Sequence, residues 1–156
     1  VMHSSKAVVA LETYMGLVEA GVGLIPAGGG CKELALRAAQ AARGGNIFHF
    51  IKQAFETIAM AQVSRSGEHA RELGLLRPTD MIVFNPNELL YIAKQQAMAL
   101  AESGYRPPLR PRDIPVAGKG GIATLKMIIA NMLEGGFISP HDAAIAERTA
   151  VHGRQS

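Results

Sequence analysis

Cysteine, tryptophan and long apolar runs are scarce in this sequence, and each shortage excludes a class of protein. The single cysteine, Cys31, cannot form an internal disulfide, which fits a reducing compartment such as the cytoplasm. No stretch approaches the ~20 uncharged apolar residues that a transmembrane helix needs. The opening Val1–Ser4 has neither an initiator methionine nor the features of a signal peptide, so we expect the chain to be a piece of a longer protein.

The composition also argues against a nucleic-acid-binding or metal-binding protein. Aromatic residues make up only 5% of the 156 residues, and the net charge of +3 is mild. The 16 Lys and Arg are scattered, except for Arg106, Arg110 and Arg112 in a proline-rich stretch, so the basic stripe of a nucleic-acid site is missing. The five histidines are spread out without a metal-binding motif, and we expect no bound metal.

Apolar spacing predicts a mainly α-helical chain with one or two short strands. The strands are expected at 7–11 and 81–84, where short apolar runs are bounded by charged or turn residues. Four polar residues are expected to be helix N-caps, namely Asn46, Ser66, Asn85 and Ser139. Helices are expected at 31–44, 47–62, 67–73, 86–104, 117–134 and from 140 onward. The helix at 47–62 has the widest apolar face and should be deeply buried.

Proline spacing divides the chain into three segments. Four of the eight prolines lie between Arg106 and Pro115, which predicts an extended linker at 105–116. Residues 1–104 then form one portion of a domain, and 117–156 form a helical tail. Two helices after a proline-rich arm are expected to serve docking or oligomerisation rather than catalysis.

Glu19 is the first candidate catalytic residue. Its sequence neighbours Leu17, Val18, Val22 and Leu24 are apolar. A carboxylate moved into apolar surroundings loses hydration, which favours its neutral form and suits a general acid near neutral pH. In the alternative interpretation, Glu19 lies on the solvent side of a half-exposed turn. The spacing alone favours this alternative.

Gly28, Gly29 and Gly30 precede a predicted helix and form a candidate anion-binding loop. Free N–H groups and the positive end of the helix dipole would point into it. Neither the dinucleotide-binding pattern nor the P-loop is present, because Gly23 is followed by Leu-Ile-Pro and Cys31 by Lys-Glu. Tight packing of a loop on a core explains such glycines equally well. Cys31 allows two interpretations. Its position at a helix N-terminus could lower the pKa of the thiol, but the favoured interpretation is a small side chain that serves packing.

Residues 16–34 together resemble a segment of the crotonase (enoyl-CoA hydratase/isomerase) superfamily. In that family a Glu is followed by a stretch ending Gly-Leu-Ile-Pro-Gly-x-Gly-Gly and then by a helix. Here the pattern is Glu19 followed by Gly-Leu-Ile-Pro-Ala-Gly-Gly-Gly at 23–30, with the Glu-to-Pro spacing preserved. Two positions depart from it: Ala27 replaces the usual Gly, and Cys31 stands where Thr is common.

Two further stretches carry the resemblance along the chain. Residues 66–76 look like the family's helix of the Ala-x-x-Ala-x-x-x-Gly-Leu-Val type. The tail from Tyr105 resembles the end of bacterial proteins that join an N-terminal 3-hydroxyacyl-CoA dehydrogenase to a C-terminal crotonase domain. The resemblance implies an α/β parent with the crotonase-like spiral fold.

By this resemblance, Glu19 corresponds to the family's second catalytic carboxylate, which exchanges a proton at the α-carbon of a 2-enoyl-CoA while water adds at the β-carbon. Val22, Ile25, Pro26 and Gly28 are the expected substrate-binding residues. The first carboxylate and the oxyanion-hole donors belong to family segments that precede Val1. We therefore expect this chain alone to be inactive.

The resemblance also sets the expected ligands and partners. The substrate is a CoA thioester, no cofactor is held by this segment, and NAD belongs only to a dehydrogenase part of the parent. We expect a homo-oligomer with no nucleic acid and no membrane span. The alternatives from other classes are a helical oligomerisation module and an acyl-CoA-binding module without catalysis.

Overall fold

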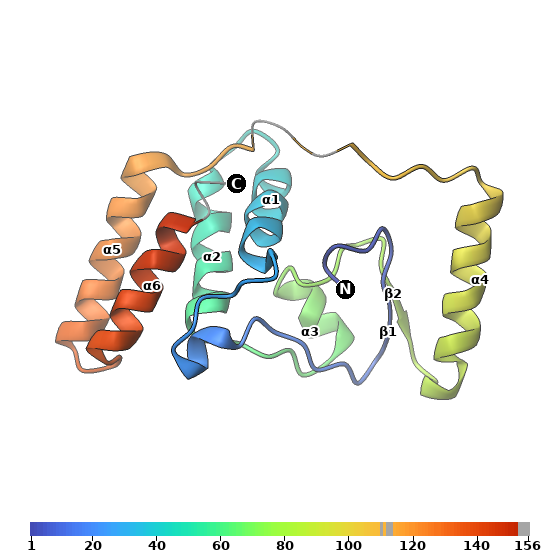
Figure 1. The fold of residues 1–156 in the computed structure, drawn as a ribbon, viewed down its shortest axis with the longest axis horizontal. Helices are drawn as coiled ribbons and strands as arrows, with labels where there is room; N and C mark the ends of the chain where they lie inside the picture. Colours follow the sequence, from blue (N-terminus) through green and yellow to red (C-terminus); the bar gives the residue numbers. More distant parts are fainter. Residues whose placement is uncertain (110, 112–113, 153–156) are drawn as a thin grey trace. The chain divides into compact units, whose positions relative to one another are not determined.

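The computed structural model describes residues 1–109, 111 and 114–152 (Figure 1). The chain divides into two compact units, and each unit combines two separate stretches of sequence: 1–15 with 64–113, and 16–63 with 114–156. Within 105–116 the described residues form neither helix nor strand, while Arg110 and Arg112 lie outside the described residues. The assignment of 1–104, 105–116 and 117–156 to parts of a longer protein stays a prediction.

The first unit contains two short parallel strands, β1 (Val8–Ala10) and β2 (Met81–Val83). Their register pairs Val9 with Ile82 at the centre. Both strands fall inside the apolar runs at 7–11 and 81–84, so these two strand predictions are confirmed.

Asp80 ties the beginnings of the two strands together. Its buried carboxylate accepts a hydrogen bond from the N–H of Ala7 at 2.8 Å and another from the N–H of Arg77 at 2.6 Å. The Arg77 guanidinium in turn donates to the carbonyl oxygen of Ser4 at 2.6 Å. Because hydrogen bonds to a charged acceptor are the strong ones, these contacts fix how the two strands begin.

Helix α3 (Gly67–Glu72) packs closely against β2. The Ser66 hydroxyl accepts a hydrogen bond from the N–H of His69 at 3.1 Å, which confirms the predicted N-cap. Ala70 is fully buried. A Cβ atom on Gly67 would stand 3.1 Å from the side chain of Ile82, so the glycine permits this close approach.

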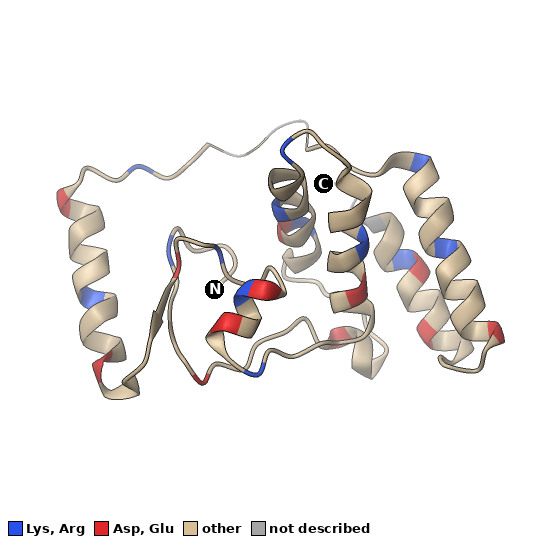
Figure 2. Ribbon diagram, turned by 180° about the vertical axis from the view of Figure 1, so that it is seen from behind, with Lys and Arg blue, Asp and Glu red and all other residues tan. Residues whose placement is uncertain are grey.

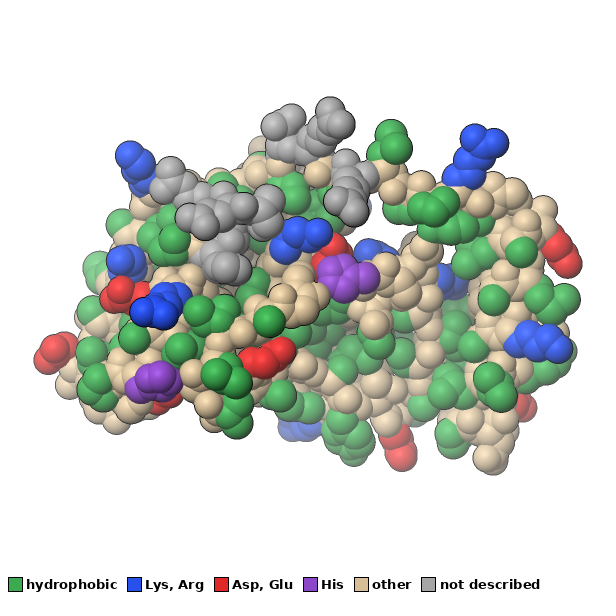
Figure 3. Space-filling model, in the orientation of Figure 1, with side chains coloured by type: hydrophobic (Ala, Val, Ile, Leu, Met, Phe, Trp, Pro, Cys, Tyr) green, Lys and Arg blue, Asp and Glu red, His purple; other side chains and the backbone are tan. Residues whose placement is uncertain are grey.

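Helix α4 (Leu89–Glu102) follows the short 3-10 turn η2 (Pro86–Glu88) and leaves its apolar side chains uncovered. Asn85 caps the turn as predicted. No residue of α4 is buried, and Leu90 and Tyr91 are 82% and 64% exposed. Figure 3 shows hydrophobic side chains at the surface of this helix. Such a surface is expected where another polypeptide covers the helix.

The described residues of the second unit form four α-helices and the short turn η1 (Glu19–Val22). These helices are α1 (Gly30–Ala42), α2 (Ile47–Ala59), α5 (Gly118–Glu134) and α6 (Pro140–His152). α1 packs against α2 and α5 against α6, while α6 also contacts α2 (Figure 1). The four predicted helices in these regions are therefore confirmed. Their core is an apolar cluster of Phe55, Leu125, Ile129, Ala143 and Ala146.

α2 is shorter and less buried than the sequence predicts. Asn46 caps it as expected, accepting a hydrogen bond from the N–H of Phe48 at 3.1 Å. The helix ends at Ala59, however, and Ala61 adopts a positive φ of 47° that is incompatible with continuing it to Gln62. The prediction that this helix is deeply buried holds only for its C-terminal part, where Phe55, Thr57 and Ile58 are buried.

α6 begins with the predicted capping box. The Ser139 hydroxyl accepts a hydrogen bond from the N–H of Asp142 at 3.1 Å, and the Asp142 carboxylate accepts one from the N–H of Ser139 at 3.1 Å. The Ser139 hydroxyl also lies 2.7 Å from that carboxylate. These hydrogen bonds, the hydroxyl first, lower the pKa of Asp142.

Charged side chains of both signs are interspersed along the helices (Figure 2). In the described part of the chain, no helix has both the length and the apolar character that crossing a membrane requires.

Candidate functional site

Glu19 begins a 3-10 turn, η1 (Glu19–Val22), in the second unit. The turn is closed by hydrogen bonds from the N–H of Gly23 to the carbonyl of Ala20 at 3.1 Å and from the N–H of Leu24 to the carbonyl of Glu19 at 2.9 Å. Gly23 has a φ of 75°, a conformation that favours glycine. The glycine therefore fixes where the chain leaves the turn that carries the carboxylate.

The Glu19 side chain is half-buried, and one of its oxygens lacks a partner. The Oε2 atom is buried and has no hydrogen bond to any described residue. Leaving a buried acceptor unsatisfied costs about 1–3 kcal/mol, so such a group points to a partner or a function. Glu19 is thus withdrawn in part from solvent, between the two arrangements that the sequence predicts.

The apolar sequence neighbours of Glu19 differ in exposure. Val18, Val22 and Leu24 are 46%, 75% and 60% exposed, whereas Leu17 and Ile25 are half-buried. The expectation that these neighbours dehydrate the carboxylate stays a prediction. Of the predicted substrate-binding residues, Val22 and Gly28 are exposed, Ile25 is half-buried and Pro26 is buried. Their role in binding stays a prediction.

The fold itself accounts for two of the three loop glycines. Gly29 is the N-cap of α1 with a φ of 80°, and a Cβ atom on Gly30 would stand 2.6 Å from a methyl group of Leu17. Gly28 has neither constraint. Among the described residues no side chain caps α1, and the N–H of Glu33 donates to the carbonyl oxygen of Gly29 at 3.0 Å. Anion binding by this loop stays a prediction, since a helix N-terminus alone does not make a site.

Cys31 lies in the first turn of α1 and is buried. Its Sγ atom donates a hydrogen bond to the carbonyl oxygen of Pro26 at 3.9 Å. Burial raises the pKa of the Cys31 thiol, and the negative charge of Glu19 raises it further. The alternative of a lowered thiol pKa is therefore wrong, and the packing interpretation is supported.

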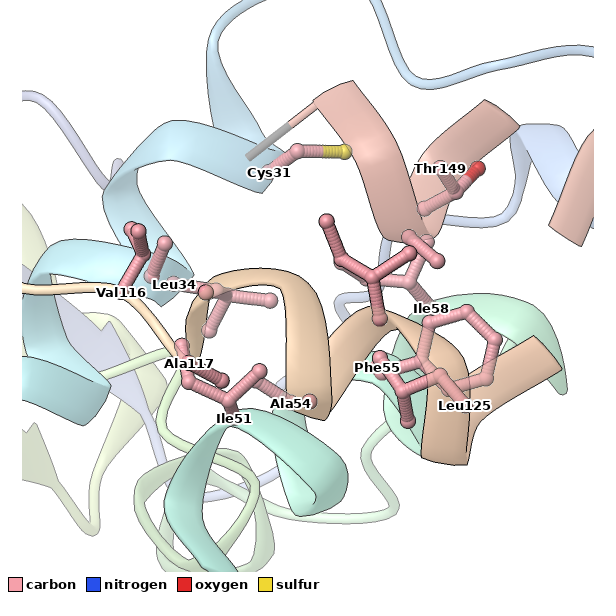
Figure 4. A pocket seen from close by; sticks show the side chains of 15 residues that line it. Cys31, Leu34, Ile51, Ala54, Phe55, Ile58, Val116, Ala117, Leu125 and Thr149 are labelled. Carbon is pink, nitrogen blue, oxygen red and sulfur yellow. The ribbon is translucent and has the colours of Figure 1, made fainter. Parts of the chain in front are cut away.

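Cys31 also lines an apolar cavity of about 70 Å³ between the four helices (Figure 4). The lining is apolar apart from the thiol and the Thr149 hydroxyl, and that hydroxyl donates to the carbonyl oxygen of Ile145 at 3.0 Å. Small residues such as Ala54 and Gly121 leave the space open. Sequence analysis missed this cavity, because α5 reaches it from a distant part of the chain.

A second cavity, of about 220 Å³, lies beside η1. Ala20 and Gly21 of the turn line it together with residues of α6, including Asp142 and Ile145. Beside this cavity, η1 contacts both α6 and α2.

His141, in the first turn of α6, contacts the end of η1 directly. Its Nε2 atom lies 3.0 Å from the carbonyl oxygen of Gly23. This contact is not predictable from the sequence, because 118 residues separate its two partners. Among the described residues, no group of three or more His, Cys, Asp or Glu side chains converges as a metal site requires.

The chain is 47% identical over 141 residues to a Bacillus subtilis (strain 168) protein named probable 3-hydroxyacyl-CoA dehydrogenase. The match covers 90% of this chain but only 18% of that protein. No protein-family model and no solved structure matches the chain. The similarity relates nearly the whole chain to part of a much longer protein, and membership of the crotonase superfamily stays a prediction.

Proposed function

We propose that Glu19 supplies one of two acid–base carboxylates to an enoyl-CoA hydratase site in a longer protein that also has 3-hydroxyacyl-CoA dehydrogenase activity. The observation that carries the proposal is the buried Oε2 atom of Glu19, which has no hydrogen-bond partner among the described residues. An acid or base that acts on a substrate needs an oxygen that the protein does not already occupy.

The similarity to a dehydrogenase supports a hydratase role, because the product of hydration is the kind of substrate that such a dehydrogenase uses. Adding water across the double bond of a 2-enoyl-CoA yields a 3-hydroxyacyl-CoA, which is the substrate in the name of the Bacillus subtilis relative. In the proposed step the oxygen of water bonds to the β-carbon and gives up one proton to the other carboxylate of the site. A proton from Glu19 bonds to the α-carbon as the C=C π bond breaks, so that the net change is the addition of one water molecule. A positioned general acid or base typically contributes about 10²–10⁴-fold to such a rate.

The remaining groups of the site come from outside this chain. By the crotonase resemblance, a first carboxylate activates the water, and two backbone N–H groups bind the thioester oxygen. Removing one such donor typically costs about 10²–10³ in rate. The same proposal gives the longer protein an α/β spiral fold and an NAD-dependent part. It also makes the CoA thioester a substrate that this chain and other segments of the longer protein bind together.

Hydration of crotonyl-CoA by two proteins tests this proposal. We expect turnover by the longer protein and none by residues 1–156 alone. Turnover by the isolated chain would contradict the proposal, since the proposed site needs two carboxylates and this chain supplies only one of them. A thermal shift of the isolated chain with a CoA thioester separates catalysis from simple binding, because a ligand of the folded state raises the apparent stability.

Self-association is a second candidate function, and the exposure of α4 favours it. Leu90 and Tyr91 lie uncovered on a helix without a buried residue. Sedimentation of the chain tests this candidate: a dimer that dissociates in Leu90→Glu supports it, and a monomer at all concentrations contradicts it.

A further inference from the structure

We infer that His141 is a positioning residue that holds the Glu19 turn in place, an inference that rests on the proposed function. Its Nε2 atom lies 3.0 Å from the carbonyl oxygen of Gly23, the residue that ends η1. The helical tail therefore has a part in the site, in addition to any docking role.

The direction of the hydrogen bond follows from its acceptor. A carbonyl oxygen only accepts, so the Nε2 atom of His141 carries the hydrogen. Both the imidazolium and the neutral tautomer protonated at Nε2 supply that hydrogen, so the contact needs no charge. A glutamine side chain can place an amide N–H in nearly the same position, whereas asparagine is one bond shorter.

Gly23 is matched to this contact in two ways. Its φ of 75° lies in the region that favours glycine, and a Cβ atom there would stand 2.7 Å from the Nε2 atom of His141. The same residue thus permits both the end of the turn and the approach of the ring.

His141 stands on an anchored part of α6. Ser139 and Asp142, which form the capping box at the start of the helix, flank His141 in the sequence. Ala143, two residues after His141, is buried in the core cluster. A contact from such a fixed point restrains the turn more than a contact between two loops does.

The restraint reaches Glu19 through the backbone of the turn. The N–H of Leu24, the residue after Gly23, donates to the carbonyl oxygen of Glu19 at 2.9 Å. A shift of Gly23 therefore moves the residue that carries the carboxylate. Because the His141 side chain is exposed, its hydrogen bond contributes little to global stability, and we expect its loss to affect catalysis before folding.

Steady-state hydration of crotonyl-CoA by the longer protein tests the inference. We expect His141→Leu and His141→Asn to lower kcat by about tenfold or more with KM within about twofold, since a ~1 Å misplacement can cost about 10² in rate. His141→Gln should retain most of kcat. His49→Leu is the matched control, because it removes an exposed histidine on α2 and should leave kcat unchanged.

Each other outcome overturns the inference. A normal kcat in both the leucine and asparagine variants shows that the contact does not position the turn. A glutamine variant as slow as the leucine variant, or a raised KM with normal kcat, excludes positioning by the N–H donor. If His141→Leu fails to fold, the asparagine variant decides. Glu19→Gln, measured in parallel, separates the two claims. Full turnover by Glu19→Gln would contradict the proposed function itself. An inactive Glu19→Gln together with a normal kcat in the His141 variants would contradict only this inference.

Discussion

The negative charge of Glu19 contributes to the raised pKa of the Cys31 thiol, second only to the burial of that thiol. Glu19 begins η1 and Cys31 lies in the first turn of α1, on either side of the loop that joins the two elements. Removing the charge of Glu19 should therefore change the reactivity of the Cys31 thiol, so that thiol reactivity measures the electrostatic effect of the proposed catalytic carboxylate.

Thiol labelling measures this relationship. At a fixed pH near 8, we expect Cys31 to react with iodoacetamide more slowly than a free thiol, because only the thiolate is nucleophilic. Glu19→Gln should speed the labelling, since it removes one cause of the raised pKa. Glu56→Gln, at a surface carboxylate paired with Lys52, is the control. Equal labelling of wild type and Glu19→Gln would show that the two groups do not interact.

The same thiol makes stability depend on alkaline pH. Its folded pKa is raised above the ordinary value of 9.0, so the folded state holds the proton after the unfolded chain has lost it. The stabilisation is complete below 9.0 and is lost as the pH rises through the folded pKa. We expect the unfolding free energy of wild type, relative to Cys31→Ala, to fall as the pH rises above 9.0. A constant difference measured by urea unfolding would contradict this expectation.

Three glycine-to-alanine variants separate conformation from close contact. Gly23→Ala should be the most destabilising, because it combines a positive φ with a Cβ position 2.7 Å from His141. Gly44→Ala carries only the positive φ, at a cost of about 1–2 kcal/mol, and Gly28→Ala carries neither constraint. Urea unfolding gives the order directly. A Gly23→Ala variant no less stable than Gly44→Ala would show that the His141 ring adds nothing to the cost of the positive φ.

The capping box predicts an acid-dependent contribution to α6. Ser139→Ala should raise the pKa of Asp142 toward its ordinary value of 3.8, as followed by NMR of the carboxyl carbon, since the Ser139 hydroxyl is the largest cause of the shift. Because the folded pKa is lowered, the stabilisation is present above 3.8 and is lost as the pH falls through the folded pKa. An unchanged Asp142 titration in Ser139→Ala would exclude this cause.

Local chemistry explains which features of the structure were predictable. Asn46, Ser66 and Ser139 were recognised as caps because each bonds an N–H only two or three residues away. The contact of His141 with Gly23 was not predictable, because it forms only after α6 packs beside η1.

The surroundings of Glu19 show the same limit. Its apolar sequence neighbours predict an enclosed carboxylate, but Val22 at the end of the turn and Leu24 after it are exposed. The apolar cavity, in contrast, is assembled from α1, α2, α5 and α6. Sequence spacing describes the faces of single helices, whereas a cavity depends on the volumes left between several of them.

Hydration of crotonyl-CoA by the longer protein carrying Glu19→Gln tests the role of Glu19 most directly. Glutamine keeps the shape of the side chain but cannot exchange the proton, and Glu56→Gln controls for the loss of a surface carboxylate. We predict a loss of kcat of about 100-fold or more in Glu19→Gln with an unchanged melting temperature. Turnover within about twofold of wild type would contradict the assignment of Glu19 as a catalytic carboxylate.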